Sequence, residues 1–229
     1  MIELFPEGYA ESRHGDEVEL AAFTDDAGAE RLRARFGNVR VEPVPEGWEE
    51  GWKRFHRPVE IGSLWVGPPW EVPSASLMPV VIDPGQAFGT GAHPTTQLCI
   101  ELLLELERGS LVDLGCGSGV VAIAAARLGF SPVVAVDVDD AAVGATEQNA
   151  AANGVEVAAR KLDLAQEPVP EADVAVANID LQTIALLRPG SDVLVTSGYY
   201  AADRPQIAGF GHLERRTREN WAADLFRRE

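Results

Sequence analysis

Beyond residue 94 the chain alternates between short apolar runs and longer stretches in which apolar residues recur with helical spacing. The apolar runs are typical of buried strands, and the longer stretches are typical of packed helices. The expected order is the helix PTTQLCIELLLELE, the strand LVDLG, the helix VVAIAAARLG, the strand PVVAVDV, the helix DDAAVGATEQNAAANG, and the strands VEVAARKLD, ADVAVANI, SDVLVTSG, HLERRT and WAADLFRR. This alternation predicts an α/β fold around a parallel sheet, with ligands bound at the carboxyl ends of its strands.

The N-terminal part follows a different pattern. Strand-like EVELAAF and VRVEPV flank helix-like DDAGAERLRARF, which together predict a small α+β domain. The next stretch predicts a short helix with Trp48, Trp52 and Phe55 on one face, followed by a strand in PVEIGSLWVGPPW. We therefore expect three parts: a small N-terminal domain over residues 1–45, a linker helix and connecting strand over 46–72, and a catalytic domain over 73–229.

Charge and composition restrict the partners and the compartment. The formal net charge is −17, spread over both halves, and no basic stripe is visible that would neutralise nucleic-acid phosphates. An acidic surface favours solubility, and it suits a basic protein partner. No apolar run approaches the roughly 20 residues of a membrane span. The N-terminus lacks a signal-peptide pattern, and the two cysteines, Cys99 and Cys116, suggest neither disulfides nor zinc, so we expect a cytoplasmic location.

The strongest chemical signal is VDLGCGSGV, residues 112–120. A buried strand carries Asp113, and Gly115, Gly117 and Gly119 then turn the chain into a helix. Glycine is needed where the backbone adopts positive φ and where a ligand must lie against bare backbone. Asp137 ends the next strand, where a carboxylate can accept hydrogen bonds from both ribose hydroxyls. Together these features predict an adenosine site.

The spacing of the glycines favours S-adenosylmethionine over a dinucleotide. The third glycine comes one position earlier than in G-x-G-x-x-G, and an acid precedes the turn, which suits a cofactor tail that carries an ammonium group. A phosphate-binding loop is excluded because no lysine follows the glycines; the chain contains only Lys53 and Lys161. A nicotinamide-dependent oxidoreductase on a similar sheet stays open as an alternative.

Asn178 ends the strand ADVAVANI, at the edge of the sheet where ligands are expected. Its amide carbonyl could accept a hydrogen bond from an amine and aim the amine lone pair at the cofactor methyl group. The simpler interpretation is that Asn178 caps the following turn.

Taken together, DPGQAFGTGAHPTT, DLGCGSGVVAIAA, QNAAANG, VANI, SGY and WAADLFRR resemble the methyltransferase family that modifies the eleventh large-subunit ribosomal protein. The resemblance covers about residues 46–229, and its first segment is the most specific. It implies a class I methyltransferase Rossmann-like sheet, mostly parallel with an antiparallel C-terminal strand. It also implies S-adenosylmethionine-dependent methylation of N-terminal and lysine amines, with the N-terminal domain recognising the ribosomal protein.

Carried over by position, the resemblance assigns cofactor contacts to Thr96, Gly115, Asp137 and Asn178, with Asn178 also at the reaction centre. Thr90 and Gly117 are added to the cofactor-binding set. The loop 83–93 is expected to fold over the methionine end, where free N–H groups of the next helix turn and the Thr96 hydroxyl would receive the carboxylate. Asp163, after the third strand of the sheet, is a further candidate to accept a hydrogen bond from the adenine amino group.

Two other residues have simpler roles by sequence. His93 is expected to cap the helix that begins at Pro94, although it could act as a base, and Cys116 is expected to fill space in the glycine turn. No histidine spacing indicates a metal site. Asp180 departs from the family pattern, as does the short segment after it, so an acceptor other than the ribosomal protein stays open. Oligomeric state is not indicated, and a monomer is compatible with the sequence.

Overall fold

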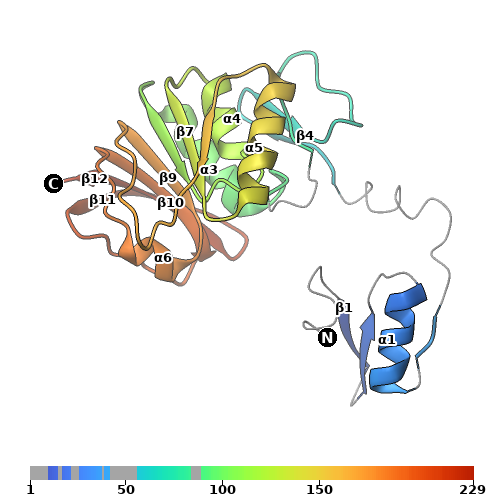
Figure 1. Cartoon of the computed structure of the whole chain (residues 1–229). Coiled ribbons are helices and arrows are strands. Elements are labelled where there is room, and N and C mark those ends of the chain that lie inside the picture. Colours follow the sequence, from blue (N-terminus) through green and yellow to red (C-terminus); the bar gives the residue numbers. More distant parts are fainter. Residues whose placement is uncertain (1–9, 15–16, 22–25, 38, 42–55, 84–88) are drawn as a thin grey trace. The chain divides into compact units, whose positions relative to one another are not determined.

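The structure is a computed structural model that describes residues 10–14, 17–21, 26–37, 39–41, 56–83 and 89–229. The chain divides into two compact units, Met1–Gly51 and Trp52–Glu229, and each is described by itself (Figure 1). None of the helices in the described part of the chain combines the length and the apolar character needed to cross a membrane.

The smaller unit contains a hairpin and a helix. Strands β1 (Ala10–His14) and β2 (Glu17–Ala21) pair antiparallel, and helix α1 (Asp26–Phe36) follows. The expected strand at 17–23 and helix at 25–36 correspond to β2 and α1, whereas β1 was not predicted because AESRH shows no clear alternation. Residues 39–41 form no strand, and the predicted aromatic helix lies outside the described residues.

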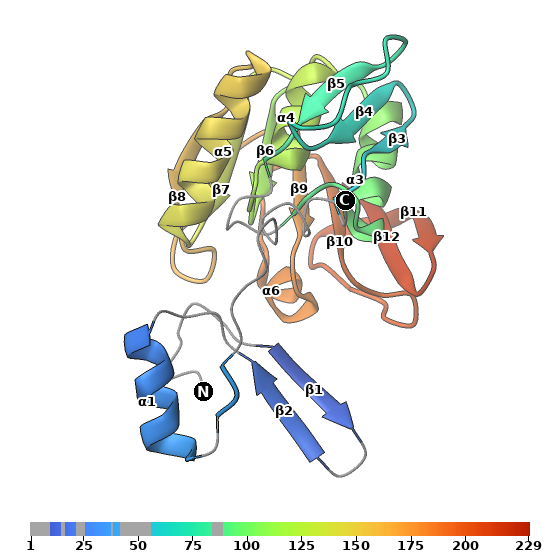
Figure 2. The same cartoon turned by 90° about the vertical axis from the view of Figure 1, so that its right-hand side faces the viewer.

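The larger unit is built on a seven-stranded sheet of order β11-β12-β10-β9-β6-β7-β8 (Figure 2). All neighbours from β10 to β8 pair parallel, and β12 alone runs antiparallel between β10 and β11. The prediction of a mostly parallel sheet with an antiparallel C-terminal strand is confirmed. The strands are β6 (Leu111–Leu114), β7 (Val133–Asp137), β8 (Ala158–Lys161), β9 (Val174–Asn178), β10 (Val193–Tyr200), β11 (Phe210–Arg218) and β12 (Trp221–Arg228).

The strands alternate their side chains between two apolar layers. In β9, for example, Val174 and Val176 point into one cluster, and Ala175 and Ala177 into the other. The first cluster includes residues of α3 (Pro94–Glu105), α4 (Val120–Arg127) and α5 (Asp140–Asn153), and the second includes residues of short α6 (Leu181–Leu186) and of connecting segments. Helices α3, α4 and α5 lie where the sequence predicted them, and only the short α6 separates β9 from β10, as expected.

A second, three-stranded sheet packs on the helix layer of the larger unit. It consists of β3 (Val59–Ile61), β4 (Leu64–Gly67) and β5 (Met78–Val81). The predicted connecting strand is a hairpin, because Gly62 at φ 55° turns the chain between β3 and β4. Buried Leu64 and Val66 belong to the same apolar cluster as α3 and α4. This part of the expected 46–72 linker thus contributes to the core of the larger unit.

Candidate functional site

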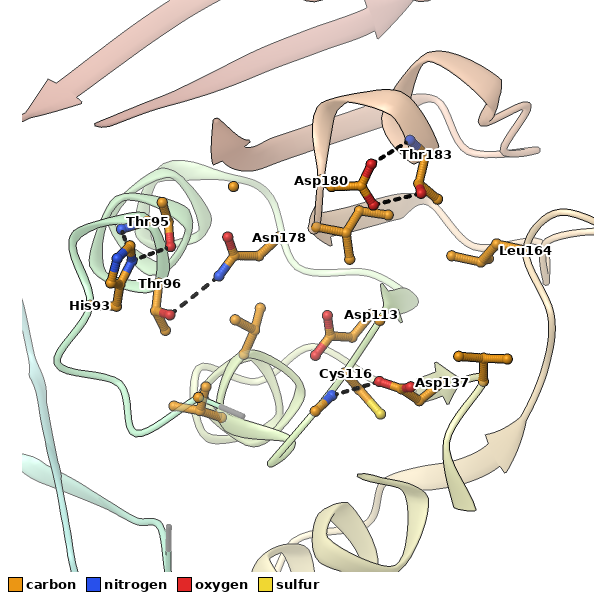
Figure 3. Close-up of a pocket in the computed structure, with 18 of the residues that line it drawn as sticks. His93, Thr95, Thr96, Asp113, Cys116, Asp137, Leu164, Asn178, Asp180 and Thr183 are labelled. Atoms are coloured by element: carbon orange, nitrogen blue, oxygen red, sulfur yellow. Dashed lines mark hydrogen bonds between the residues drawn. The ribbon is translucent and has the colours of Figure 1, made fainter. Parts of the chain in front are cut away.

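A cavity of about 550 Å³ lies at the carboxyl ends of the central parallel strands (Figure 3). This is the edge at which the sequence predicted a ligand. Its lining contains five of the six residues predicted to contact the cofactor: Thr96, Gly115, Gly117, Asp137 and Asn178. Thr90 does not line it, although its neighbour Gly89 does.

The three glycines after β6 all adopt positive φ, at 78° for Gly115, 53° for Gly117 and 81° for Gly119. Two of them also lie against other atoms. A Cβ on Gly115 would come within 2.3 Å of Ile179 Cγ2, and one on Gly119 within 2.8 Å of Thr146 Cγ2. The glycine turn therefore requires glycine both for its backbone conformation and for close packing.

The carboxylate of Asp137 organises this turn. Its Oδ2 accepts a hydrogen bond from Gly117 N at 3.0 Å, and its Oδ1 accepts one from Asp139 N at 3.1 Å. A carboxylate oxygen has two acceptor sites, so both oxygens can accept further bonds from a ligand. Val138, next in the chain, also lines the cavity and is 59% exposed. The hydrogen-bond-accepting carboxylate of Asp137 therefore lies next to the exposed apolar side chain of Val138.

Asp113 is buried on β6 and lines the cavity. Its Oδ2 accepts a hydrogen bond from Ala122 N, in the first turn of α4, at 3.1 Å. Burial raises the pKa of Asp113 from 3.8 to about 7, because removal from water disfavours the charged carboxylate. A cation bound beside it would reverse that effect.

The first turn of α3 differs from the prediction. His93 caps this helix: its Nδ1 accepts from Thr95 N at 3.3 Å, and its carbonyl accepts from Thr96 N and Gln97 N at 3.1 and 3.2 Å. Pro94 has no N–H to offer. The expectation of free N–H groups for a carboxylate was therefore wrong, and the expectation that His93 caps the helix is confirmed.

Asn178 is in contact with α3. Its Nδ2 donates to Thr96 Oγ1 at 3.3 Å, so its Oδ1 is the atom available to accept a hydrogen bond from an amine. The cap of the next helix is instead Asp180, whose Oδ1 accepts from Gln182 N and Thr183 N, both at 3.0 Å. A hydrogen bond from the Thr183 hydroxyl, together with these two backbone bonds, lowers the pKa of Asp180. The simpler interpretation of Asn178 as a cap does not hold.

Several lining residues were not predicted, among them Asp180, Thr183, Leu164, Gly198 and Trp221. An Asp just before a helix indicates an N-cap, so the sequence could have shown the capping role of Asp180 but not its place in the cavity. Trp221 begins β12 and comes from the far end of the chain, so no local pattern marks it. Its ring meets the His93 ring edge-on at 4.8 Å and stacks on Tyr200 at 4.7 Å.

Two other candidates have local roles. Cys116 accepts a hydrogen bond from the Thr146 hydroxyl at 3.3 Å, and burial raises the pKa of its thiol to about 12, so it is a poor nucleophile. Asp163 accepts bonds from Ala165 N and Gln166 Nε2 in its own loop and does not line the cavity. In the described part of the chain, no three His, Cys, Asp or Glu side chains are grouped to hold a metal ion.

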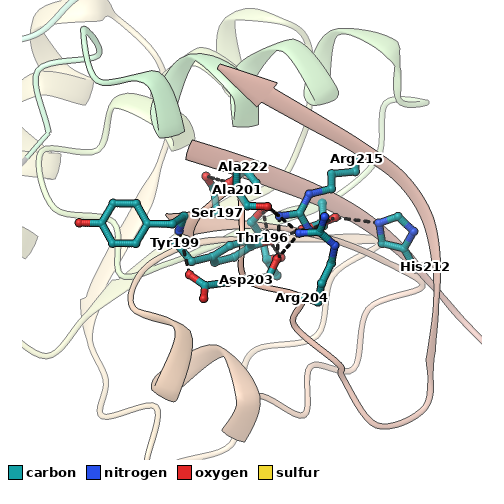
Figure 4. A network of polar contacts seen from close by, with 11 residues as sticks. Thr196, Ser197, Tyr199, Ala201, Asp203, Arg204, His212, Arg215 and Ala222 are labelled. Atoms are coloured by element: carbon teal, nitrogen blue, oxygen red, sulfur yellow. Dashed lines mark hydrogen bonds and ion pairs between the residues drawn. The ribbon is translucent and has the colours of Figure 1, made fainter. Parts of the chain in front are cut away.

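A buried polar network fixes the strand that carries Trp221 (Figure 4). Asp224 on β12 has no exposed surface and accepts bonds from Tyr199 OH at 2.7 Å and from Arg215 Nη1 at 3.1 Å. His212 Nε2 lies 2.7 Å from its other oxygen. The network joins β10, β11 and β12, and so holds the C-terminal wall of the cavity.

The sheet order, the single antiparallel strand and the glycine turn opening on this cavity define a class I methyltransferase fold. The family model described as ribosomal protein L11 methyltransferase (PrmA) matches residues 10–202. The chain belongs to this family.

Individual relatives agree with the family match. The chain is 40% identical over 210 residues to the ribosomal protein L11 methyltransferase of Symbiobacterium thermophilum, covering 83% of this chain and 68% of the relative. The corresponding protein of Vibrio cholerae is 42% identical over 191 residues, covering 75% and 62%. The chain thus spans about two thirds of the length of these relatives. A solved structure of ribosomal protein L11 methylase from Lactobacillus delbrueckii superposes with a TM-score of 0.65 at 28% identity, over 76% of this chain and all of that one.

Proposed function

We propose that this protein is an S-adenosylmethionine-dependent methyltransferase that acts on amino groups of ribosomal protein L11, both its N-terminal α-amine and lysine ε-amines. The observation that carries the proposal is that one cavity joins the Asp137 and Asp113 carboxylates to the Asn178 amide. Family membership supports the same reaction and the same substrate.

The cavity fits the proposed cofactor in size and chemistry. Its volume of about 550 Å³ lies within the range usual for small-molecule sites. Asp137 would accept hydrogen bonds from the ribose hydroxyls, and the exposed side chain of Val138 and the apolar Leu164 would contact the adenine ring. Asp113 would hold the ammonium group, which favours the ionised carboxylate. S-adenosylmethionine supplies a methyl group on a sulfonium sulfur when bound.

The acceptor amine would bind near Asn178 and must be neutral to react. At neutral pH, deprotonating a lysine of ordinary pKa costs about 4 to 5 kcal/mol, whereas an N-terminal amine costs about 1 kcal/mol. The N-terminal amine is therefore the easier substrate. Asn178 Oδ1 would orient the amine, and the apolar walls would exclude water, so the chain would act by positioning rather than by a strong base.

The partner is proposed to be a basic protein, because the chain carries a net charge of −17. The smaller unit, Met1–Gly51, is proposed to help recognise it. No direct contact with nucleic acid or membrane is part of the proposal, and a cytoplasmic site of action follows from a ribosomal substrate. Another protein or small-molecule acceptor is the alternative, because Asp180 adds an ionised carboxylate to the lining.

The proposal is tested by incubating the protein with S-adenosylmethionine labelled in its methyl group and purified ribosomal protein L11. Label on L11 amines, mapped by mass spectrometry, is the expected result. Calorimetric binding of S-adenosylhomocysteine but not NAD would accompany it. Cofactor binding without label on L11 would show that the acceptor is a different molecule, and failure to bind S-adenosylhomocysteine would overturn the assignment.

A further inference from the structure

Two asparagines of α5 form hydrogen bonds to the end of β5 as a neighbouring strand would. Asn153 Oδ1 accepts from Val81 N at 2.8 Å, and its Nδ2 donates to Val81 O at 2.6 Å. One helical turn earlier, Asn149 Oδ1 accepts from Asp83 N at 3.0 Å, and its Nδ2 reaches Asp83 O at 3.4 Å. Both side chains are buried, at 5% and 4% exposure. Their spacing of four residues on a helix matches the two-residue repeat of an extended chain.

Asn149 has one contact that Asn153 lacks. Its Nδ2 also donates to Ser118 O, in the glycine turn, at 2.9 Å. Asn153 Nδ2 instead donates to Asn149 O within the same helix. Asn149 therefore links Asp83 directly to the turn that lines the cavity, and Asn153 serves only to hold β5 on α5.

Ser118 makes a second link from the same turn. Its side chain is fully buried, and its hydroxyl donates to the carbonyl of Gly89, which lines the cavity. Gly89 adopts φ 106°, and a Cβ there would stand 3.2 Å from Ser118 Oγ. The turn thus holds Asp83 on one side, through Asn149, and Gly89 on the other, through Ser118.

We propose that Asn149 and Ser118 are positioning residues for the cofactor: they hold Asp83 and Gly89 against the glycine turn, and so set the positions of that turn and of Gly89, which line the cavity that would bind S-adenosylmethionine. The inference rests on the proposed function for the identity of the ligand. Neither side chain lines the cavity, so each acts through the backbone that it holds.

The test compares Ser118→Ala and Asn149→Ala with Asn153→Ala as the matched control. Losing one buried hydrogen bond that shapes the site should raise the Kd for S-adenosylhomocysteine about tenfold in Ser118→Ala and in Asn149→Ala. The control should lower Tm about as much as Asn149→Ala, and its Kd should stay within about twofold of the wild type. The kcat at saturating cofactor should change little in all three variants, so the effect should appear in KM for the cofactor.

A second readout needs no ligand. Amide exchange at Asp83, followed by NMR in the free protein, should accelerate in Asn149→Ala and stay slow in Asn153→Ala. Wild-type Kd in both Ser118→Ala and Asn149→Ala, or an equal loss of affinity in the control, would overturn the inference. Failure of the wild type to bind S-adenosylhomocysteine would overturn the proposed function. The role of Asn149 in holding Asp83 is tested separately, and unchanged amide exchange at Asp83 in Asn149→Ala would reject it.

Discussion

Asn178 at the end of β9 donates its Nδ2 to the hydroxyl of Thr96 in the first turn of α3, at 3.3 Å. The two residues are far apart in the sequence and come together only because α3 packs across the sheet beside β10 and β9. The bond selects the orientation of the amide, since it leaves Oδ1 for a ligand. Asn178, which is proposed to orient the acceptor amine, is therefore itself oriented by Thr96 in the first turn of α3.

Replacing Thr96 with Val should remove this orientation while preserving volume. We expect kcat to fall about tenfold or more, because the amide would lose the partner that fixes it. Asn178→Ala should reduce kcat further while changing the Kd for S-adenosylhomocysteine much less. Kinetics with L11 and calorimetry check both effects, and an unchanged kcat in Asn178→Ala would remove this residue from the chemistry.

Gly198→Ala should damage the site through the backbone. Gly198 adopts φ 101° in the bulge of β10, and a Cβ there would lie 2.1 Å from the carbonyl oxygen of Ile179, the residue after Asn178. Backbone cannot move aside as a flexible side chain can, so the variant should lose both stability and kcat. Gly209→Ala is the control, because Gly209 has φ 80° with open space around it.

For this pair, urea unfolding should show about 1 kcal/mol lost in the Gly209 variant, from the left-handed backbone alone, and clearly more in the Gly198 variant. Equal losses in the two proteins would mean that the contact with Ile179 relaxes without cost.

Asp113→Asn should alter the pH dependence of stability. The pKa of Asp113 rises from 3.8 to about 7 on folding, so between those pH values the folded protein holds a proton that the unfolded chain has released. The contribution of Asp113 to stability is therefore full below about pH 4 and is lost as pH rises to about 7. Asparagine does not titrate.

The free energy of unfolding of the wild type relative to Asp113→Asn should consequently fall by about 1 kcal/mol or more from pH 4.5 to pH 7.5. Urea titrations of both proteins in matched buffers measure this difference. A constant difference across the range would show that Asp113 titrates normally in the folded protein.

Asp113→Asn should also distinguish contacts to the amino-acid end of the cofactor from contacts to its adenosine end. If Asp113 holds the ammonium group, Asp113→Asn should weaken binding of S-adenosylhomocysteine about tenfold, because a charge-assisted hydrogen bond is lost. Binding of 5′-methylthioadenosine, which lacks the amino-acid tail, should change much less. Equal weakening of both ligands in calorimetry would place Asp113 elsewhere in the site.

Tyr199→Phe should destabilise the C-terminal strands. The Tyr199 hydroxyl lies 2.7 Å from buried Asp224, and its loss leaves that carboxylate without one of its donors. We expect a loss of about 1 to 3 kcal/mol in urea unfolding. Tyr200→Phe is the matched control: Tyr200 is 58% exposed, and its stacking on Trp221 needs only the ring, so its stability should stay within about 0.5 kcal/mol of the wild type. A Tyr199 variant as stable as this control would contradict the role of the network.

The sequence alone determined the periodic features of this protein. Apolar runs such as LVDLG and VVAVD fixed the central strands, and glycines at 115, 117 and 119 fixed the turn, because both depend on local spacing and backbone conformation. The sequence placed Asp137 and Asn178 at the cavity for the same reason: each is the last residue of a strand, and parallel strands end at one edge.

Only the tertiary structure decided which distant residues meet there. Trp221 lines the cavity because β12 inserts antiparallel beside β10, and Asn149 reaches Ser118 and Asp83 because α5 packs on β5. The amides at the start of α3 were misjudged because their bonds depend on the conformation of His93. A short stretch of sequence shows its hydrophobic periodicity and its backbone preferences. Long-range hydrogen bonds and close contacts depend instead on how distant elements pack, which no short stretch contains.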